Sequence, residues 1–317
     1  MKIKFWGVRG SLPGQAYSFE GAERIRRILK LYTNSEYSAT NDLDRFIQSL
    51  SHVELNGYGT ATTSVQVFSA RHGDKNIIID GGSGIRYISD AVAAKKYVQK
   101  EYHIFITHFH LDHIIGLPFF TPHFLTGHKI NYYSVQPECE EIVRSVFKKP
   151  IFPVGYEDLN ATIQFINLKP YETKMVNGFA VTPYKLDHPD PCYGFRVEHD
   201  GKVYAHAVDS EIQRRTEIDL GMDSGLYKSA DMIYIDAQYA EEEMLHKKGW
   251  GHGTFERAFE LSHHFKIKQV CMAHYDPNAS DESIESFKLR AEKFYEERKD
   301  EYKFNWKFVH ETEIVGV

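Results

Sequence analysis

The sequence predicts an α/β protein in which two β-sheets pack face to face and helices cover their outer faces. Three observations support this fold class. About a dozen short runs rich in β-branched and aromatic residues alternate with helical patterns along the chain. Neither a linker rich in Pro, Gly or Ser nor an internal repeat divides the 317 residues. Hydrophobic residues make up 42% of them, enough for a full core. We therefore expect one domain over residues 1–317.

The elements follow from local patterns in chain order. The predicted strands are Lys2–Val8, Ser64–Ala70, Asn76–Asp80, Tyr102–Thr107, Lys129–Val135, Ala161–Leu168, Phe179–Leu186, Gly194–His199, Lys202–Asp209, Met232–Asp236, Gln269–Ala273 and Asn305–His310. The dipeptide Asp200-Gly201 is typical of a two-residue hairpin turn. The predicted helices are Glu20–Tyr32, Asn41–Leu50, Ile85–Tyr97, Glu138–Lys148, Ala240–His246, Thr254–His264 and Asp281–Tyr302.

The segment from about Ala16 to Tyr58 differs from its surroundings. It is polar and helical, and it interrupts two strand regions. We interpret residues 16–58 as an insertion and call them the helical arm. Three roles remain open: a solvated helical excursion, a cap over a substrate, or the contact of a homodimer.

Composition limits the classes of partner. The chain has 38 Lys and Arg against 44 Asp and Glu, a formal net charge of -6. This balance disfavours a long polyanion such as nucleic acid but is compatible with a small phosphate ester. No run approaches the 18 or more apolar residues of a transmembrane helix, and the first residues lack the apolar run of a signal peptide. We expect a cytoplasmic protein with no membrane partner.

Metal ligands are expected to be nitrogen and oxygen atoms. Three widely spaced cysteines argue against a disulfide framework and a Cys-based zinc site. By contrast, His108, His110, Asp112 and His113 follow the apolar run 102–107 directly. In an extended chain His108 and His110 face one side, while Asp112 and His113 lie where the chain turns toward a helical pattern. Imidazoles and a carboxylate suit a divalent cation such as zinc or manganese.

This His-x-His-x-Asp-His motif after a strand resembles the metallo-β-lactamase superfamily of metal-dependent hydrolases. The resemblance implies a four-layer αββα sandwich and three further ligands, in the order His, Asp, His, at the ends of later strands. His188, Asp209 and His274 stand in that order after predicted strands. The family also has an aspartate after an earlier strand, matched by Asp80, which is implied to orient ligands rather than to bind metal.

Carried over residue by residue, the resemblance implies a binuclear metal centre. The implied ligands of one ion are His108, His110 and His188, those of the other are Asp112, His113 and His274, and Asp209 bridges the two. Asp112 and Asp209 are also expected to be catalytic. Zinc is the first expectation for both ions, with manganese or iron as alternatives. No other cofactor is expected.

A second motif resembles the phosphodiesterase branch of this superfamily, which includes tRNA 3′-processing endonucleases and cyclic-phosphate phosphodiesterases. Residues 249–258 read Gly-Trp-Gly-His-Gly-Thr-Phe-Glu-Arg-Ala, with Thr254 as a helix N-cap and His252 exposed between glycines. In that branch the extra histidine lies beside the metals, where it hydrogen-bonds a phosphate oxygen or protonates the departing oxygen. The segments Phe5–Pro13 and Tyr58–Ser64 resemble the same branch. No cysteine lies near Asp209, unlike in many true β-lactamases.

The resemblance thus implies a hydrolase that cleaves a phosphodiester with a hydroxide bridging two metals, assisted by His252. A small cyclic nucleotide or cyclic phosphate is the first substrate expected. The alternatives are RNA 3′ processing, hydrolysis of a lactone or acyl group on the same metals, and a metal-binding sensor without turnover. The basic pairs of the chain are expected to be solvated faces, and Lys247-Lys248, near His252, is the candidate among them for steering a phosphate. His123 is expected in a loop, with a place facing the substrate as the alternative.

Overall fold

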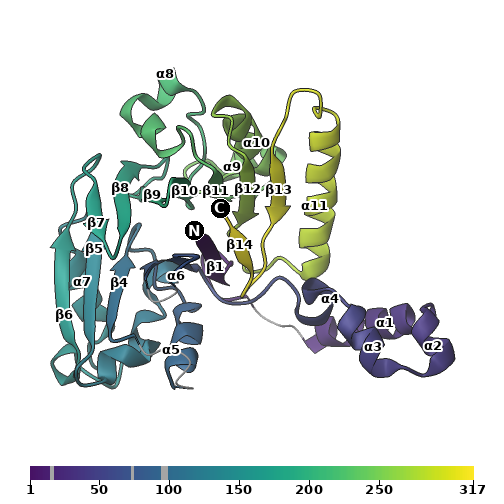
Figure 1. The fold of residues 1–317 in the computed structure, drawn as a ribbon, viewed down its shortest axis with the longest axis horizontal. Helices are drawn as coiled ribbons and strands as arrows, with labels where there is room; N and C mark the ends of the chain where they lie inside the picture. Colours follow the sequence, from purple (N-terminus) through teal and green to yellow (C-terminus); the bar gives the residue numbers. More distant parts are fainter. Residues whose placement is uncertain (15–17, 73–74, 94–98) are drawn as a thin grey trace.

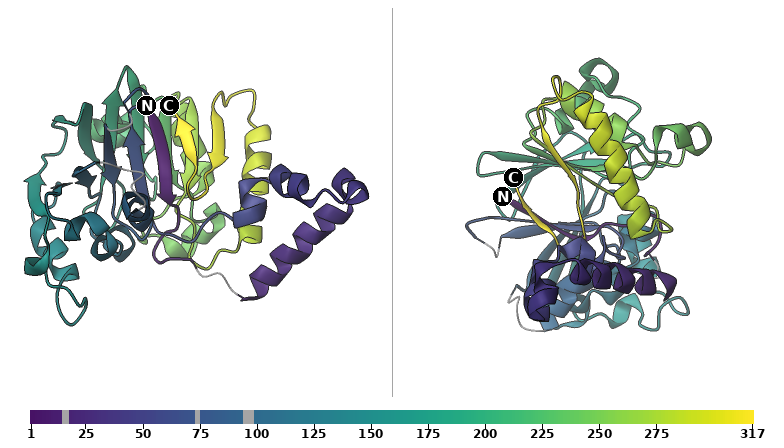
Figure 2. Two further views of the ribbon diagram at one scale, coloured as in Figure 1. Left: turned by 60° about the horizontal axis from the view of Figure 1, so that its bottom comes forward. Right: turned by 90° about the vertical axis from the view of Figure 1, so that its right-hand side faces the viewer.

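The computed structural model describes residues 1–14, 18–72, 75–93 and 99–317. Two seven-stranded sheets pack face to face, and helices cover the outer face of each (Figures 1 and 2). The predicted α/β class and the four-layer αββα arrangement are therefore confirmed.

The two sheets have the same pattern of strand directions. The first has the order β14 (Ile314–Gly316), β1 (Lys2–Gly7), β2 (Ser64–Phe68), β3 (Asn76–Ile79), β4 (Glu101–Phe105), β5 (Lys129–Ser134) and β6 (Thr162–Asn167). The second has the order β13 (Asn305–Phe308), β12 (Gln269–Ala273), β11 (Met232–Asp236), β10 (Lys202–Ala207), β9 (Tyr193–His199), β8 (Phe179–Lys185) and β7 (Lys174–Val176). In each sheet one half is antiparallel and the other is parallel, from β3 to β6 and from β10 to β13. The parallel halves bring several carboxyl ends of strands to one edge.

Helices form the two outer layers and the arm. The helices are α1 (Ser18–Thr33), α2 (Glu36–Thr40), α3 (Leu43–Ser49), α4 (His52–Asn56), α5 (Ile85–Ala93), α6 (Leu111–Ile114), α7 (Cys139–Val146), α8 (Glu217–Leu220), α9 (Met244–Lys247), α10 (Phe255–His264) and α11 (Asp281–Glu296). Helices α5 and α7 pack on the first sheet, and α10 and α11 pack on the second. None of the helices in the described residues is long and apolar enough to cross a bilayer.

The core between the sheets holds their strand ends in fixed relative positions. Aromatic rings join the two layers directly: Phe5 of β1 lies 4.7 Å from Tyr234 of β11, and Phe105 of β4 lies 5.4 Å from Phe195 of β9, between ring centroids. All four side chains are fully buried. Each burial contributes roughly 1.5–3 kcal/mol for a side chain of this size. The sheets therefore form a rigid platform for side chains at their common edge.

All the predicted strands are present, with ends that differ by at most two residues. The edge strands β7 and β14, and the short helices α2, α4 and α8, were not predicted because three to five residues are too short for a periodic signal. The predicted helix 41–50 is shorter, because Asp42 caps α3 and accepts a hydrogen bond from Arg45 N. The predicted helix 281–302 ends at Glu296. The end of the predicted helix Ile85–Tyr97 lies outside the described residues.

The helical arm projects from one side of the sandwich as α1–α4 (Figure 1). Its predicted start at Ala16 lies outside the described residues. The arm is anchored at the start of α11, where Asp281 pairs with Arg24 and accepts a hydrogen bond of 3.0 Å from Tyr58 N. The Tyr58 hydroxyl donates to Glu285 Oε1 at 2.8 Å. These contacts lie at the base of the arm, so its far end extends away from the sheets.

Candidate metal centre

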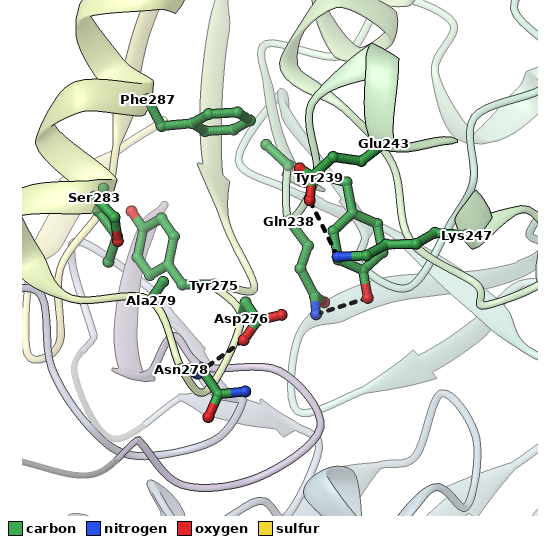
Figure 3. A pocket seen from close by; sticks show the side chains of 12 residues that line it. Gln238, Tyr239, Glu243, Lys247, Tyr275, Asp276, Asn278, Ala279, Ser283 and Phe287 are labelled. Atoms are coloured by element: carbon green, nitrogen blue, oxygen red, sulfur yellow. Dashed lines mark hydrogen bonds and ion pairs between the residues drawn. The ribbon is translucent and has the colours of Figure 1, made fainter. Parts of the chain in front are cut away.

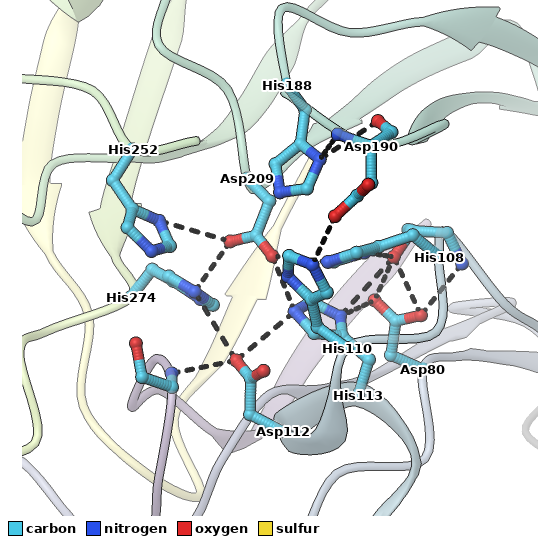
Figure 4. Close-up of polar contacts among 12 residues, drawn as sticks. Asp80, His108, His110, Asp112, His113, His188, Asp190, Asp209, His252 and His274 are labelled. Carbon is cyan, nitrogen blue, oxygen red and sulfur yellow. Dashed lines mark hydrogen bonds and ion pairs between the residues drawn. The ribbon is translucent and has the colours of Figure 1, made fainter. Parts of the chain in front are cut away.

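The candidate site lies where strand ends from both sheets meet (Figure 4). Residues at a strand end, or at most three residues after one, supply most of it: Asp80 after β3, His108 after β4, His188 after β8, Asp209 after β10, Asp236 at the end of β11 and His274 after β12. The single turn α6 begins after its N-cap His110 and carries Asp112 and His113. Placement at the carboxyl ends of strands is typical of ligand sites in α/β folds.

Three site residues leave their strands through a strained backbone conformation. Asp80, Asp209 and His274 have φ values of 65°, 62° and 64°, in the left-handed region that side chains rarely adopt. Such a conformation costs on the order of 1–3 kcal/mol each and is concentrated at functional sites. The sharp change of direction ends the strand and turns each side chain into the site. It also explains why the strands predicted to end at Asp80 and Asp209 stop one and two residues earlier.

Three groups of donor atoms share Asp209; two match the implied ligand sets, and the third consists of Asp209, Asp236, His252 and His274. Atoms of the first group lie within 4.8 Å of one another and come from His108, His110, His188 and Asp209. The second group meets the same limit and comes from Asp112, His113, Asp209 and His274. The structure therefore brings together all seven side chains implied as ligands, in the two sets that the sequence motif implies. Their role as ligands remains a prediction.

Unsatisfied buried atoms test whether these residues fit divalent cations. Among the described residues, buried atoms without a hydrogen-bond partner include Nε2 of His108, His113, His188 and His274 and both carboxylate oxygens of Asp209. Asp209 Oδ1 lies 2.6 Å from His274 Nε2, and Oδ2 lies 2.7 Å from His113 Nε2, without hydrogen-bond geometry. Unpaired buried polar groups are costly, and cations at the points where these lone pairs converge would satisfy them. The residues fit two cations.

In His113 and His110, a neighbouring carboxylate contacts one of the two ring nitrogens. His113 Nδ1 donates to Asp80 Oδ2 at 2.9 Å, and His110 Nε2 lies 2.9 Å from Asp190 Oδ2. Asp80 is not in either donor group, and Thr107 N and Oγ1 both donate to it. Contacts of this kind set the tautomer and orientation of a ligating imidazole. The position of Asp80 agrees with the orienting role implied by the sequence.

The charge states suit metal binding. Burial, reinforced by the neighbouring His113, lowers the pKa of His108 to about 4, so its imidazole is neutral near pH 7. Burial alone would raise the pKa of Asp209, but His274 and His113 hold it well below its usual range. A neutral His108 imidazole and an ionised Asp209 carboxylate are forms that bind divalent cations.

His252 lies beside the second donor group, and a hydrogen bond to Asp236 holds its ring in position. Its Nδ1 donates to Asp236 Oδ2 at 2.9 Å and lies 3.6 Å from Asp209 Oδ1. The sequence predicted an exposed His252, and this is wrong: the residue is only 7% exposed, because Asp236 draws the ring inward. Burial alone would lower the pKa of His252, but the carboxylates of Asp236 and Asp209 raise it to about 10. The two carboxylates thus favour the charged form of the ring.

Sequence reasoning missed several supporting residues. Glu211 is buried, and its carboxylate accepts hydrogen bonds from Gly249 N and Gly251 N, which holds the loop that carries His252. Asp236 was not selected, although it ends an apolar strand as Asp209 was predicted to do, and that shared position was the available signal. Glu211 and Asp190 carry no comparable local signal, because each acts on a segment that folding brings close.

The structure also places His123 and Lys247, two residues considered as possible contacts of the substrate. His123 does not face the cleft: it is fully buried, and its Nε2 lies 2.7 Å from the Tyr132 hydroxyl. Lys247 pairs with Glu243 at 3.2 Å and lies 3.8 Å from the centroid of the Tyr239 ring. Lys247 is therefore not among the residues lining the cleft but lines a pocket that adjoins it.

A cleft of about 570 Å³ opens over the second donor group. Its described lining residues are Ser11, His110, Leu111, Asp112, Pro189, Asp209, Gln238, Tyr239, Gly249, Trp250, His252, Asp276, Pro277 and Asn278. Ser11 N donates to Asp112 Oδ2 at 2.9 Å, which ties the turn after β1 to α6. Trp250 is 59% exposed at the rim. None of the described lining residues is Lys or Arg, and none belongs to the helical arm.

Gly10 leaves the space that His274 occupies. A Cβ at this position would lie 2.4 Å from His274 Cδ2 and 2.6 Å from its Nε2. We expect Gly10→Ala to displace the imidazole and to lower the metal content of purified protein, measured by elemental analysis. The matched control is Gly316→Ala, where a Cβ meets nothing within 4 Å. Equal metal content in both variants would contradict the assignment of His274 as a ligand.

Comparisons with known proteins agree with this geometry. Residues 75–275 match the family model described as the beta-lactamase superfamily domain. Ribonuclease Z of Staphylococcus haemolyticus (strain JCSC1435) is 24% identical over 230 residues, which are 59% of this chain and 74% of that protein. The metallo-beta-lactamase fold protein YhfI from Bacillus subtilis superposes with a TM-score of 0.63 at 15% identity, over 99% of this chain and 98% of YhfI. Zn²⁺-bound PqqB from Methylobacterium extorquens has a TM-score of 0.63 at 16% identity, over the whole of both chains (100% and 100%).

Proposed function

The chain belongs to the beta-lactamase superfamily, and on this basis we propose that it is a binuclear metal-dependent phosphodiesterase acting on a small cyclic nucleotide or cyclic phosphate. One observation carries the proposal. Two groups of donor atoms share Asp209, and the charged His252 lies against the same carboxylate. This arrangement combines a site for two cations with a proton donor that is not itself among the seven predicted ligands.

The residues around Asp209 have separable roles. Two divalent cations would supply Lewis-acid stabilisation of a phosphoryl oxygen and activation of water. The imidazoles of His108, His188 and His274 would hold the cations, together with Asp209, which belongs to both donor groups. Asp112 belongs to the second donor group, and Ser11 N fixes its carboxylate from the opposite side.

His252 is positioned to assist the departing oxygen. Asp236 keeps the ring charged, so it can donate a hydrogen bond or a proton to the alkoxide that leaves phosphorus. The Glu211 carboxylate holds the backbone on the N-terminal side of His252, and Thr254 begins α10 by capping Arg257 N at 3.3 Å. His252 is therefore held between a loop fixed by Glu211 and the N-terminus of α10.

The cleft favours a small substrate. Its volume of about 570 Å³ lies within the ~300–1,000 Å³ range of small-molecule sites. Proteins that bind single-stranded nucleic acid usually use a positively charged groove along the backbone. The described lining residues carry no Lys or Arg, and the chain has a net charge of -6. A small phosphate held by the cations needs no such groove.

Zinc is the proposed metal. Nitrogen and oxygen donors accept zinc, manganese or iron, and PqqB, which shares the fold, was solved with zinc bound. Elemental analysis of protein purified without added metal tests this choice.

RNA 3′ processing is the second candidate function. The similarity to ribonuclease Z over 230 residues supports it, although the two sequences are only 24% identical. The two candidates use the same chemistry and differ in how the substrate is held. Binding to a polyanion weakens steeply with salt, whereas binding of a small phosphate depends on salt much less.

Turnover of bis(p-nitrophenyl) phosphate by protein reloaded with zinc or manganese tests the proposal. It is accompanied by a panel of cyclic nucleotides and a precursor tRNA with a 3′ extension, each at several salt concentrations. We expect metal-dependent turnover and a preference for a cyclic nucleotide. Preference for the tRNA with a steep salt dependence would favour RNA processing. Two bound metals with lactone hydrolysis and no phosphodiester turnover would favour acyl hydrolysis instead, and two bound metals with no turnover would favour a sensor.

We also propose that residues 1–317 form one domain with the helical arm as its insertion. The two sheets share one core, and the described part of the arm contributes no residue to the cleft lining. A cap over the substrate is therefore not the favoured role. Exposed Ile25, Leu29 and Leu43 on α1 and α3 support the homodimer alternative, which sedimentation of wild-type and arm-deleted protein would test.

A further inference from the structure

A side pocket of about 280 Å³ adjoins the cleft over the metal centre. It lies between the segment after β11, helix α9, the segment after β12 and the first half of α11 (Figure 3). Gln238, Tyr239, Asp276 and Asn278 line both cavities. The side pocket is therefore an extension of the cleft, and a ligand whose phosphate lies at the metal centre can reach into it.

Aromatic rings line opposite sides of the side pocket. In Figure 3, Tyr275 and Phe287 lie on one side and Tyr239 lies on the other. The Tyr275 hydroxyl donates to Val309 O at 2.8 Å, which fixes that ring. On the opposite side Lys247, which also lines the pocket, lies over the Tyr239 ring with its Nζ 3.8 Å from the ring centroid, and it pairs with Glu243. The half-buried Phe287 ring suits a flat aromatic group, which gains stacking energy at a low cost in conformational entropy.

The boundary between the two cavities carries unused hydrogen-bonding capacity. Gln238 is 91% buried, since its exposed fraction is 9%. Its Nε2 donates to the Tyr239 hydroxyl at 3.3 Å, but Oε1 has no partner among the described residues. Turning the amide over would leave its other end without a partner. Beside it, the exposed amide of Asn278 offers a further donor and acceptor. These groups match the polar edge of a heterocycle better than a hydrocarbon ring, which would leave Gln238 unsatisfied.

We propose that this side pocket binds the base of a nucleotide whose phosphate lies at the metal centre, with the ring against Phe287 and its polar edge at Gln238. The inference rests on the proposed function, because it takes the metal centre as the place of the phosphate. The pocket's volume lies just below the range of whole small-molecule sites, which suits one ring system rather than a complete nucleotide. A base of this kind makes the substrate a nucleoside cyclic phosphate rather than a simple sugar cyclic phosphate.

Calorimetric titration of zinc-loaded protein with AMP and with ribose 5-phosphate tests the inference, because the two probes differ only in the base. We expect AMP to bind about 5- to 150-fold more tightly, the range that corresponds to stacking of one base. Phe287→Leu, which removes the ring and keeps an apolar side chain, should bring the affinity ratio close to one. The matched control is Leu289→Ala on the same helix, 63% exposed and outside the pocket, which should keep the wild-type ratio.

Phe287 also packs on Phe255, with ring centroids 5.1 Å apart, so Phe287→Leu could lower the stability of the fold. A second variant therefore tests the pocket without removing a packed side chain. Ser283→Phe adds a ring at an exposed position that lines the pocket, and it should block the base in a protein with unchanged thermal unfolding. Equal affinities of wild-type protein for AMP and ribose 5-phosphate, or an unchanged ratio in both variants, would overturn the inference. A clear preference for AMP without any phosphodiester turnover would instead overturn the proposed function and leave the base pocket standing.

Discussion

Asp209→Ala is expected to abolish both metal binding and phosphodiester turnover. Asp209 belongs to both donor groups, and both of its carboxylate oxygens are buried without hydrogen-bond partners among the described residues. Its removal takes one donor from each predicted cation and leaves five imidazoles with Asp112 as the one carboxylate among the predicted ligands. Metal stabilisation of transition-state charge is worth several kcal/mol, so we expect the rate to fall at least about 10³-fold. Elemental analysis and turnover of bis(p-nitrophenyl) phosphate measure the two effects.

The control for this variant is Asp44→Ala, which removes an exposed carboxylate from the helical arm. It should keep the metal content and rate of the wild-type protein. Circular dichroism checks that Asp209→Ala keeps the fold, since the site lies at the edge of the sheets rather than in the core between them. An Asp209→Ala protein that still binds two metals would show that the two donor groups are not one binuclear centre.

His252→Ala is expected to keep the metals and lose rate. The residue is not one of the seven predicted ligands, and its ring is held by Asp236. Loss of a positioned general acid typically lowers the rate by about 10²–10⁴-fold. The loss should be largest for substrates with a poor leaving group, such as a cyclic nucleotide, because p-nitrophenolate departs without a proton. Comparing kcat for the two substrates in wild-type and variant protein measures this difference.

The matched control is His263→Ala, which removes an exposed histidine near the end of α10. It should leave both rates unchanged. If His252→Ala lost zinc as completely as Asp209→Ala, the histidine would be a metal ligand. It would then bind metal through the third donor group, which consists of His252, Asp209, Asp236 and His274. Full turnover of every phosphodiester by His252→Ala would place the chain outside the phosphodiesterase branch.

Much of the site follows from local chain geometry. His108 and His110 were placed by their spacing after one strand, whereas His188, Asp209 and His274 were implied by the family resemblance, which their order after later strands matches. Strand ends are local events, set by where an apolar run stops and a polar residue turns the chain. The carboxyl ends of parallel strands meet at one edge, so the order of strand-end residues already indicates which side chains converge. The same reasoning applied to Asp236 would have found it.

The tertiary structure decided the features that depend on contacts between distant segments. Asp190 reaches His110 across 80 residues, and Glu211 holds the loop at Gly249 and Gly251 from about 40 residues away. The burial of His252 and the side pocket beside α11 also depend on contacts between distant segments. Periodicity and spacing report only how neighbouring side chains are oriented along one element. The sequence by itself therefore determined the fold class, the predicted ligands and their order. Packing of the two sheets, which sets distances between remote segments, decided how those ligands are held and what surrounds the substrate.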